Sequence, residues 1–146
     1  MGFCHPLLGH TQEQEKLPII YIAGPYMGRG WPWPLSFLKQ VWNIYRAVRA
    51  GVHLMQKGWA VIIPHSMTCL MPLLSGYKLK WEDFMRMDLR IVEAADALLY
   101  LAPSKGADIE LKHAQRCGKV VYRQIEDVPF TREFIGGDRF DDVQAN

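Results

Sequence analysis

Four short apolar runs divide the chain, and each is bounded by residues that break regular structure. They cover residues 19–23, 59–63, 96–101 and 119–122 and are rich in β-branched and aromatic side chains. Hydrophobicity within them is largely continuous rather than alternating, which is typical of strands buried on both faces of a parallel sheet. The pattern therefore predicts four parallel strands.

A helical period separates the first two runs. Apolar residues recur every three or four positions from Phe37 to Met55, and Ser36 precedes them as a candidate N-cap. Lys57 and Gly58 supply a cation and a glycine suited to the helix end. We expect a helix over residues 36–57.

Two further helices are expected, over residues 81–94 and from Ser104 to about residue 117. Residues 64–80 form a long connection, of a length that often marks a functional loop. Residues 1–18 lack any period and are expected to form a flexible tail, which leaves residues 19–146 as the domain. Within it, residues 123–146 are expected to add an edge strand or to wrap a neighbour.

Strands alternating with helices of this length predict a single α/β domain. Its parallel sheet would be the middle of three layers, with right-handed crossovers between the strands. Ligands of such sheets bind beyond the carboxyl ends of the strands. The loops at 24–35, 64–80 and 102–106 are therefore where we expect chemistry.

The composition narrows the class of protein without naming one. The 146 residues, 49% apolar and 22% charged, suit one globular domain. A net charge of +2 does not favour nucleic acid or a membrane surface as partner, and no apolar run approaches the ~20 residues of a membrane span. Three scattered cysteines and no signal-peptide pattern favour the cytoplasm.

The loop after the first strand carries Gly24, Tyr26, Gly28 and Arg29. Glycines let backbone amides approach a ligand, and an arginine can bind a phosphate or a carboxylate through two hydrogen bonds. The loop matches neither GxGxxG nor a Walker sequence, so an ordinary connection with a solvated arginine fits equally well. Tyr26 is a candidate hydrogen-bonding partner of a sugar or of an acid.

The helix after the third strand begins with Ser104 and Gly106. Its free amides and its dipole favour an anion, although Ser104 can also serve as a plain N-cap. Glu110 lies one and a half turns further on, where the positive helix end favours its ionised form. Such a carboxylate beside an anion pocket is suited to attack a sugar carbon; a solvated surface glutamate is the alternative.

Asp88 interrupts the apolar stripe of the helix at 81–94. A buried carboxylate is costly unless it is paired or used, which indicates a cleft; an acid at the margin of the stripe is the alternative. His65 follows the second strand and suits either the same cleft or a structural role. With Cys69 four residues later it does not make a metal site, and no metal is expected.

Together these segments resemble the nucleoside 2-deoxyribosyltransferase superfamily, which includes nucleoside 5′-monophosphate N-glycosidases and small phage-type relatives. The resemblance covers IYIAGPY at 20–26, VIIPH at 61–65, MDLRIVEAADALLYL at 87–101 and SKGADIELKHAQRCGKVV at 104–121. The spacing S-x-G-x-x-x-E, following an MDL helix, is its most specific part. It implies a flavodoxin-like or Rossmann-like fold.

The resemblance also implies an activity. Glu110 would attack the glycosidic carbon, and Asp88 would transfer a proton to the base or from water. Where transferases acting on free nucleosides carry an acid, Ser104 matches the serine with which the monophosphate hydrolases bind phosphate. We therefore expect an N-glycosidase that hydrolyses a (deoxy)nucleoside 5′-monophosphate. Base exchange between deoxynucleosides is the alternative activity, and a non-catalytic nucleotide-binding module is the alternative of another class.

The expected partner is thus a small-molecule nucleoside or nucleotide, with no cofactor, no nucleic acid and no membrane. Sites in this superfamily are often completed by a neighbouring subunit, so a homodimer or larger homo-oligomer is expected. The substrate-binding residues implied are Gly24, Tyr26, Gly28, Arg29, His65, Ser104 and Gly106.

Overall fold

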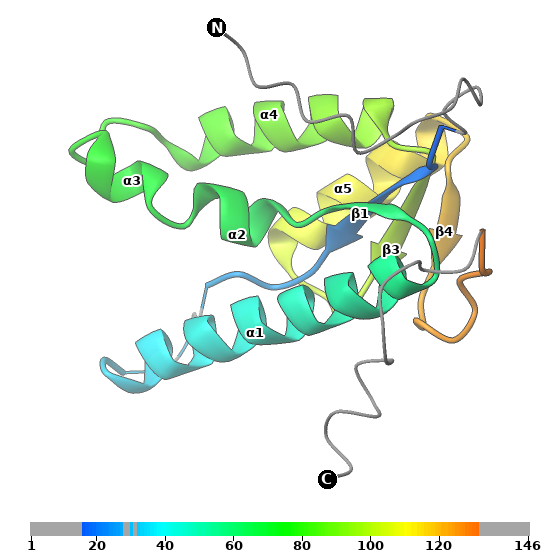
Figure 1. Cartoon of the computed structure of the whole chain (residues 1–146). Coiled ribbons are helices and arrows are strands. Elements are labelled where there is room, and N and C mark those ends of the chain that lie inside the picture. The colour runs from blue at the N-terminus through cyan, green and yellow to red at the C-terminus, as the bar shows by residue number, and fades with distance from the viewer. Residues whose placement is uncertain (1–15, 28–29, 31, 132–146) are drawn as a thin grey trace, which may run out of the picture.

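A four-stranded parallel sheet forms the centre of the protein (Figure 1). The computed structural model describes residues 16–27, 30 and 32–131. The strand order is β2-β1-β3-β4, and every neighbouring pair is parallel. The strands are β1 (Ile19–Ala23), β2 (Ala60–Ile62), β3 (Ala97–Tyr100) and β4 (Val120–Tyr122).

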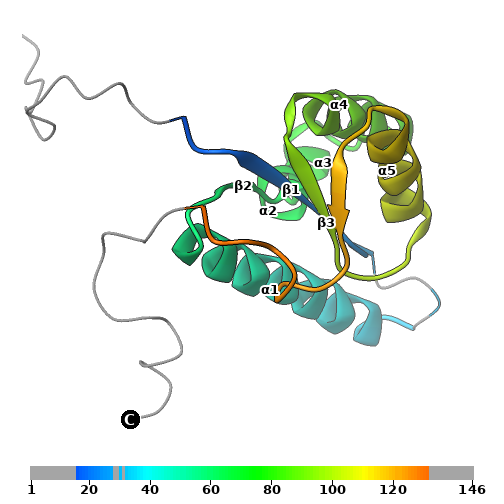
Figure 2. The same cartoon turned by 90° about the vertical axis from the view of Figure 1, so that its right-hand side faces the viewer.

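Helices cover both faces of this sheet (Figure 2). One face is covered by α1 (Leu35–Gln56), and the other by α4 (Trp81–Ala94) and α5 (Lys105–Arg116). The short helices α2 (Pro64–Thr68) and α3 (Met71–Leu74) connect β2 to α4. The predicted single α/β domain with a three-layer, Rossmann-like parallel sheet is confirmed.

The central strand β1 shows why its sequence is apolar throughout. Ile20 and Ile22 pack in the core beneath α1, whereas Tyr21 and Ala23 pack in the core beneath α4 and α5. All four side chains are fully buried. A strand with two buried faces needs no alternation of polar and apolar residues.

Two local expectations are wrong. Ser36 is not the N-cap of α1, because the amides of Phe37 and Leu38 already bond to the carbonyl of Pro34, which caps the helix. The connection at 64–80 is not a plain loop, since it contains α2 and α3. Each of these short helices has a proline in its first turn, where the missing N–H is not needed.

Helix α1 also turns its large apolar residues outward. Its buried residues are Asn43, Ala47, Ala50, Gly51 and Leu54, most of which are small. The apolar stripe that predicted the helix, from Phe37 onward, is largely exposed. An apolar stripe ordinarily faces the core; here the period is right but the orientation is reversed.

A strap of residues 124–131 closes the corner between α1 and β2. The Lys57 Nζ donates hydrogen bonds to the carbonyls of Ile125 (2.7 Å) and Val128 (2.8 Å), and Trp59 Nε1 donates to the carbonyl of Pro129 at 2.8 Å. Val128 is fully buried. This described part of the expected terminal segment therefore packs on its own chain and adds no strand.

The remaining predictions on the chain ends concern residues 1–15 and 132–146, which lie outside the described residues. Within the described part, the carbonyl of Pro18 already accepts a hydrogen bond from the Ala60 amide at 2.9 Å. No helix among the described residues is long and apolar enough to cross a membrane.

Candidate active site

A cavity of about 650 Å³ opens beyond the carboxyl ends of β1, β2 and β3. Such a volume accommodates a drug-sized or nucleotide-sized ligand. The predicted site residues brought together in its wall are Gly24, Tyr26, His65, Asp88, Ser104, Gly106 and Glu110. Gly28 and Arg29, which were predicted to join them, lie outside the described residues.

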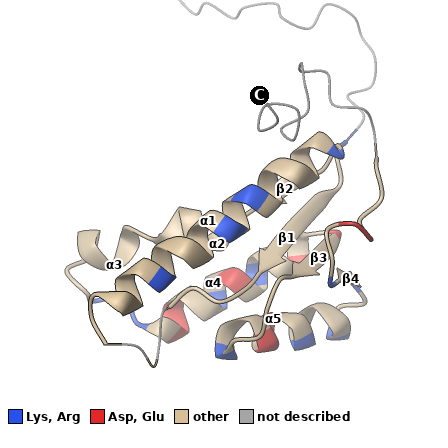
Figure 3. Ribbon diagram, turned by 90° about the horizontal axis from the view of Figure 1, so that it is seen from below, with Lys and Arg blue, Asp and Glu red and all other residues tan. Residues whose placement is uncertain are grey.

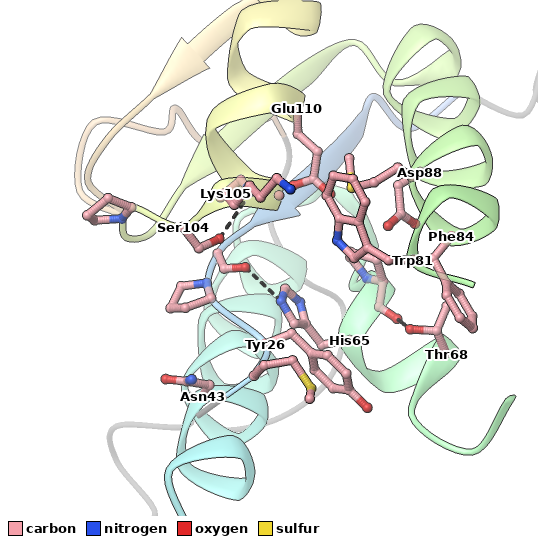
Figure 4. A pocket seen from close by; sticks show the side chains of 18 of the residues that line it. Tyr26, Asn43, His65, Thr68, Trp81, Phe84, Asp88, Ser104, Lys105 and Glu110 are labelled. Carbon is pink, nitrogen blue, oxygen red and sulfur yellow. Dashed lines mark hydrogen bonds between the residues drawn. The ribbon is translucent and has the colours of Figure 1, made fainter. Parts of the chain in front are cut away.

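Two carboxylates reach this cavity from different helices (Figure 4). Asp88 comes from α4 and is 8% exposed, and Glu110 comes from α5 and is 5% exposed. The hydroxyl of Tyr21 donates a hydrogen bond to Glu110 Oε1 at 2.9 Å. Asp88 Oδ1 and Glu110 Oε2 are buried and have no hydrogen-bond partner in the protein. Because unsatisfied buried polar atoms are rare and costly, these two are explained best by a ligand.

Burial raises the pKa values of both acids, that of Glu110 to about 7 and that of Asp88 to about 6. Tyr21 opposes this rise in the pKa of each acid through its hydroxyl, and the charge of Asp88 adds to the rise at Glu110. Acids that interact in this way titrate as a pair. Glu110 has the higher pKa of the two, and the hydrogen bond that Tyr21 donates to it partly offsets the effect of burial.

The prediction that the environment of Glu110 favours its ionised form is therefore wrong. The positive end of α5 was predicted to favour the charged form, but burial outweighs the helix dipole and raises the pKa. Of the two partners expected for Tyr26, the acid is wrong, because Tyr21, inside the strand, bonds to the glutamate. Tyr26 lies at the cavity wall beside His65, and a hydrogen bond from it to a sugar stays a prediction.

The first turn of α5 forms one end of the cavity. Ser104 is its N-cap, as predicted, and its Oγ accepts a hydrogen bond from the Ala107 amide at 3.1 Å. The serine O–H remains able to donate to a ligand, alongside the free amides of a helix N-terminus. The Lys105 ammonium lies 4.5 Å from the centroid of the Trp81 ring across the cavity (Figure 4). This end therefore combines hydrogen-bond donors with positive charge.

His65 is fixed by the backbone of the β1 loop. Its Nε2 lies 2.8 Å from the carbonyl of Gly24, and because a carbonyl only accepts, Nε2 must carry the proton. Burial lowers the pKa of His65, so the ring is neutral and Nδ1 is an acceptor. That Nδ1 is buried without a partner. The ring of Tyr26 is 5.5 Å away and tilted, so these two residues form one aromatic corner of the site.

Sequence reasoning missed three contributors to this site. Tyr21 gave no signal beyond a hydroxyl in an apolar run, because its partner Glu110 is 89 positions away. Asn43 lines the cavity from α1 with its Nδ2 buried and unpartnered. The only signal of Asn43 in the sequence was a polar amide side chain on the same helix face as several small residues. Arg46 lies one turn further along the same wall.

No group of three or more histidine, cysteine or acidic residues among those described is placed to hold a metal ion. The described groups that can take part in chemistry at the cavity include its two acids, the tyrosine bonded to one of them and the first turn of α5. A buried pair of acids with raised pKa values beside a helix N-terminus is suited to nucleophilic substitution at a carbon near an anionic group.

Comparison with known families adds one result. The model of a family described as a domain of unknown function, DUF4406, matches residues 41–123, more than half of the chain. The chain belongs to the DUF4406 family. The matched part of this DUF4406 protein contains Asp88, Ser104 and Glu110, whereas β1 with Tyr21 precedes it. No curated protein matches the chain.

Proposed function

We propose that this DUF4406 protein is an N-glycosidase that hydrolyses the bond between base and sugar of a (deoxy)nucleoside 5′-monophosphate. The observation that carries the proposal is the pair Asp88 and Glu110, each buried in the cavity wall with one oxygen unpartnered. The resemblance to the nucleoside 2-deoxyribosyltransferase superfamily assigns the same two residues to catalysis.

The arrangement of the cavity supports a phosphorylated substrate. The first turn of α5, with Ser104 and the ammonium of Lys105, offers donors and positive charge to a phosphate. Glu110 lies on the same helix, six residues after Ser104. A nucleotide whose phosphate binds at the helix end therefore has its sugar close to this carboxylate. The aromatic ring of Phe84 also lines the cavity and suits a flat base, whereas a face of Trp81 is covered by the Lys105 ammonium.

The reaction follows from the protonation of the pair. Glu110 Oε2 attacks C1′ of the sugar, so that a bond from oxygen to C1′ forms while the bond from C1′ to the base nitrogen breaks. The electron pair leaves with the base, which takes the proton of Asp88. Asp88, now ionised, then removes a proton from water as the water oxygen attacks C1′. This second step releases sugar phosphate and restores ionised Glu110.

Tyr21 is proposed to position the nucleophile. Its hydrogen bond to Oε1 orients the Glu110 carboxylate, and Oε2, which has no hydrogen-bond partner among the described residues, is the atom we propose to attack once substrate is bound. The bond also lowers the pKa of Glu110 against the effect of burial, which favours the ionised form that the attack requires. Burial and the two acids raise the pKa of Tyr21 itself, so its hydroxyl stays protonated and can donate the hydrogen bond.

The test is a panel of ribonucleoside and deoxyribonucleoside 5′-monophosphates, assayed for free base and sugar phosphate by chromatography. We expect wild-type protein to release both from at least one nucleotide. Glu110→Gln should release neither, whereas Glu126→Gln, the same change at an exposed position away from the cavity, should match wild type.

A second free base is included in a parallel set of reactions. If the bases are exchanged and no sugar phosphate is released, the protein is a deoxyribosyltransferase and not a hydrolase. Binding of a nucleotide by calorimetry, equal in wild type and Glu110→Gln and without turnover of any substrate, would show a non-catalytic nucleotide-binding module instead. From the resemblance we also propose a homodimer or larger homo-oligomer located in the cytoplasm.

A further inference from the structure

Helix α1 is apolar on two opposite faces, and the face toward the sheet is the smaller one. Ala47, Ala50 and Gly51 lie against the strands and allow a close approach. A Cβ added to Gly51 would lie 2.6 Å from Ile63 Cδ1, so a larger residue at this position would have to displace the end of that side chain. The large side chains of α1 are consequently left on the outer face.

Six of these outer residues form what we call the α1 stripe: Phe37, Leu38, Val41, Trp42, Tyr45 and Val48. Their spacing of three and four places them along one side of the helix over three turns. Trp42 is 58% exposed and Leu38 59% exposed, and the rings of Trp42 and Tyr45 stack with centroids 5.4 Å apart. Nothing in the described part of the chain packs over this side of the helix (Figures 1 and 2).

The size of the α1 stripe is that of half an interface. Three aromatic and three aliphatic side chains, exposed by about half, leave roughly 600 Å² of apolar surface in water. A monomer seldom exposes a larger continuous patch, and a stable interface buries about 800 Å² per partner. Aromatic residues at the centre of such a patch are typical binding hot spots.

We propose that the α1 stripe is the interface of a homodimer, in which two copies of α1 pack antiparallel across a two-fold axis. A two-fold axis brings the same patch of both copies together, so a straight stripe of ridges on one helix can pack into the grooves of its copy. This inference depends only on α1 and would stand without the proposed glycosidase activity.

The charges of α1 favour the antiparallel arrangement. The helix has no acidic residue, and apart from Lys39 its basic residues lie in the second half: Arg46, Arg49 and His53. Figure 3 shows the lysines and arginines of α1 in blue. A parallel pair would place these like charges side by side. An antiparallel pair places the basic half of one helix beside the nearly uncharged half of the other, and it also opposes the two helix dipoles.

Two alternatives to this homodimer interface are less well supported: a membrane surface as the partner of α1, and an interface formed by another exposed patch of the molecule. A helix that lies on a membrane is rich in lysine and arginine on its polar face, whereas two of the basic residues of α1, Lys39 and Arg46, line the cavity. The second exposed apolar patch of the molecule contains Leu74 on α3, which is 81% exposed. Because α3 has four residues, it cannot offer a regular ridge over several turns.

Sedimentation equilibrium of the full chain tests the proposal. We expect wild type at twice the 16.8 kDa chain mass at micromolar concentration. The double variant Leu38→Glu/Trp42→Glu should sediment as a monomer with an unchanged circular dichroism spectrum, because glutamate favours helix. The matched control Leu74→Glu, which puts the same charge on the other patch, should remain a dimer.

If the double variant does not fold, Trp42→Ala takes its place and should raise the dimer dissociation constant at least tenfold. Three results would overturn the proposal. The first is a wild type that is monomeric and does not bind vesicles. The second is a dimer that Leu74→Glu dissociates but the stripe variants do not. The third is a wild type that is monomeric in solution but floats with vesicles of anionic lipid, which would make a membrane the partner.

Discussion

Replacing Glu110 by glutamine should make the protein more stable and abolish its activity. The glutamate is 5% exposed, and burial raises its pKa from 4.5 to about 7. At about 1.4 kcal/mol per pKa unit, the ionised carboxylate costs the folded state roughly 3 kcal/mol above pH 7. Glutamine keeps the shape and the acceptor for Tyr21, but its buried amide needs a partner, at a cost of about 1 kcal/mol. We expect a net gain of about 2 kcal/mol at pH 8.

The dependence on pH identifies the cause. Because the pKa of Glu110 is higher in the folded than in the unfolded chain, the folded state holds more protons between pH 4.5 and about pH 7. Wild type therefore loses stability as the pH rises through this window. The gain from Glu110→Gln should accordingly fall to near zero at pH 5.

Urea denaturation at pH 5 and pH 8, followed by circular dichroism, measures both values. Glu126→Gln removes an exposed carboxylate and serves as the control, with less than about 0.5 kcal/mol of change at either pH. The reasoning is refuted if Glu110→Gln is no more stable than wild type at pH 8, or if the same gain is found at pH 5.

Three further changes test other parts of the argument. Tyr21→Phe removes the hydrogen bond that lowers the pKa of Glu110. We therefore expect kcat to fall ten- to a hundredfold and the acid limb of the pH profile of kcat/KM to move to higher pH. An unmoved profile would contradict the positioning role of Tyr21. Ser104→Asp puts a negative charge at the N-terminal end of α5, where it would repel a phosphate. In steady-state assays, KM for a nucleoside monophosphate should rise at least tenfold, whereas KM for the free nucleoside should not. Lys57→Met removes the two short hydrogen bonds to the strap of residues 124–131. It should lower the free energy of unfolding by about 2–3 kcal/mol. If neither the urea midpoint nor the proteolysis of the strap changes, Lys57 does not stabilise the strap.

Much of the fold was predictable because the signals are local. Continuous apolar runs bounded by glycine, proline and charged residues located all four strands to within one or two positions. Ser104 was recognisable as an N-cap from its own sequence context, and the glycines Gly58 and Gly118 that follow α1 and α5 have positive φ angles of 89° and 68°. Turn and cap chemistry of this kind depends on a few neighbouring residues.

The orientation of α1 was not predictable in the same way. A period of three to four reports that a helix has an apolar side, but not that this side faces the core. The tertiary structure places α1 close to β2, where a Cβ on residue 51 would come within 2.6 Å of Ile63 Cδ1 and where small residues fit without displacing that side chain. Small residues therefore faced inward, and the large stripe from Phe37 to Val48 faced outward.

The candidate site divides along the same line. The sequence alone determined the parallel α/β class, the loops at the carboxyl edge, and Asp88, Ser104 and Glu110 as the residues to examine, because period, cap and spacing are encoded in neighbouring positions. Only the tertiary structure decided that Tyr21 bonds to Glu110, that burial raises the pKa of this acid, and that the large apolar residues of α1 face outward. Each of these depends on which distant surfaces meet, and on how much water and space remain between them.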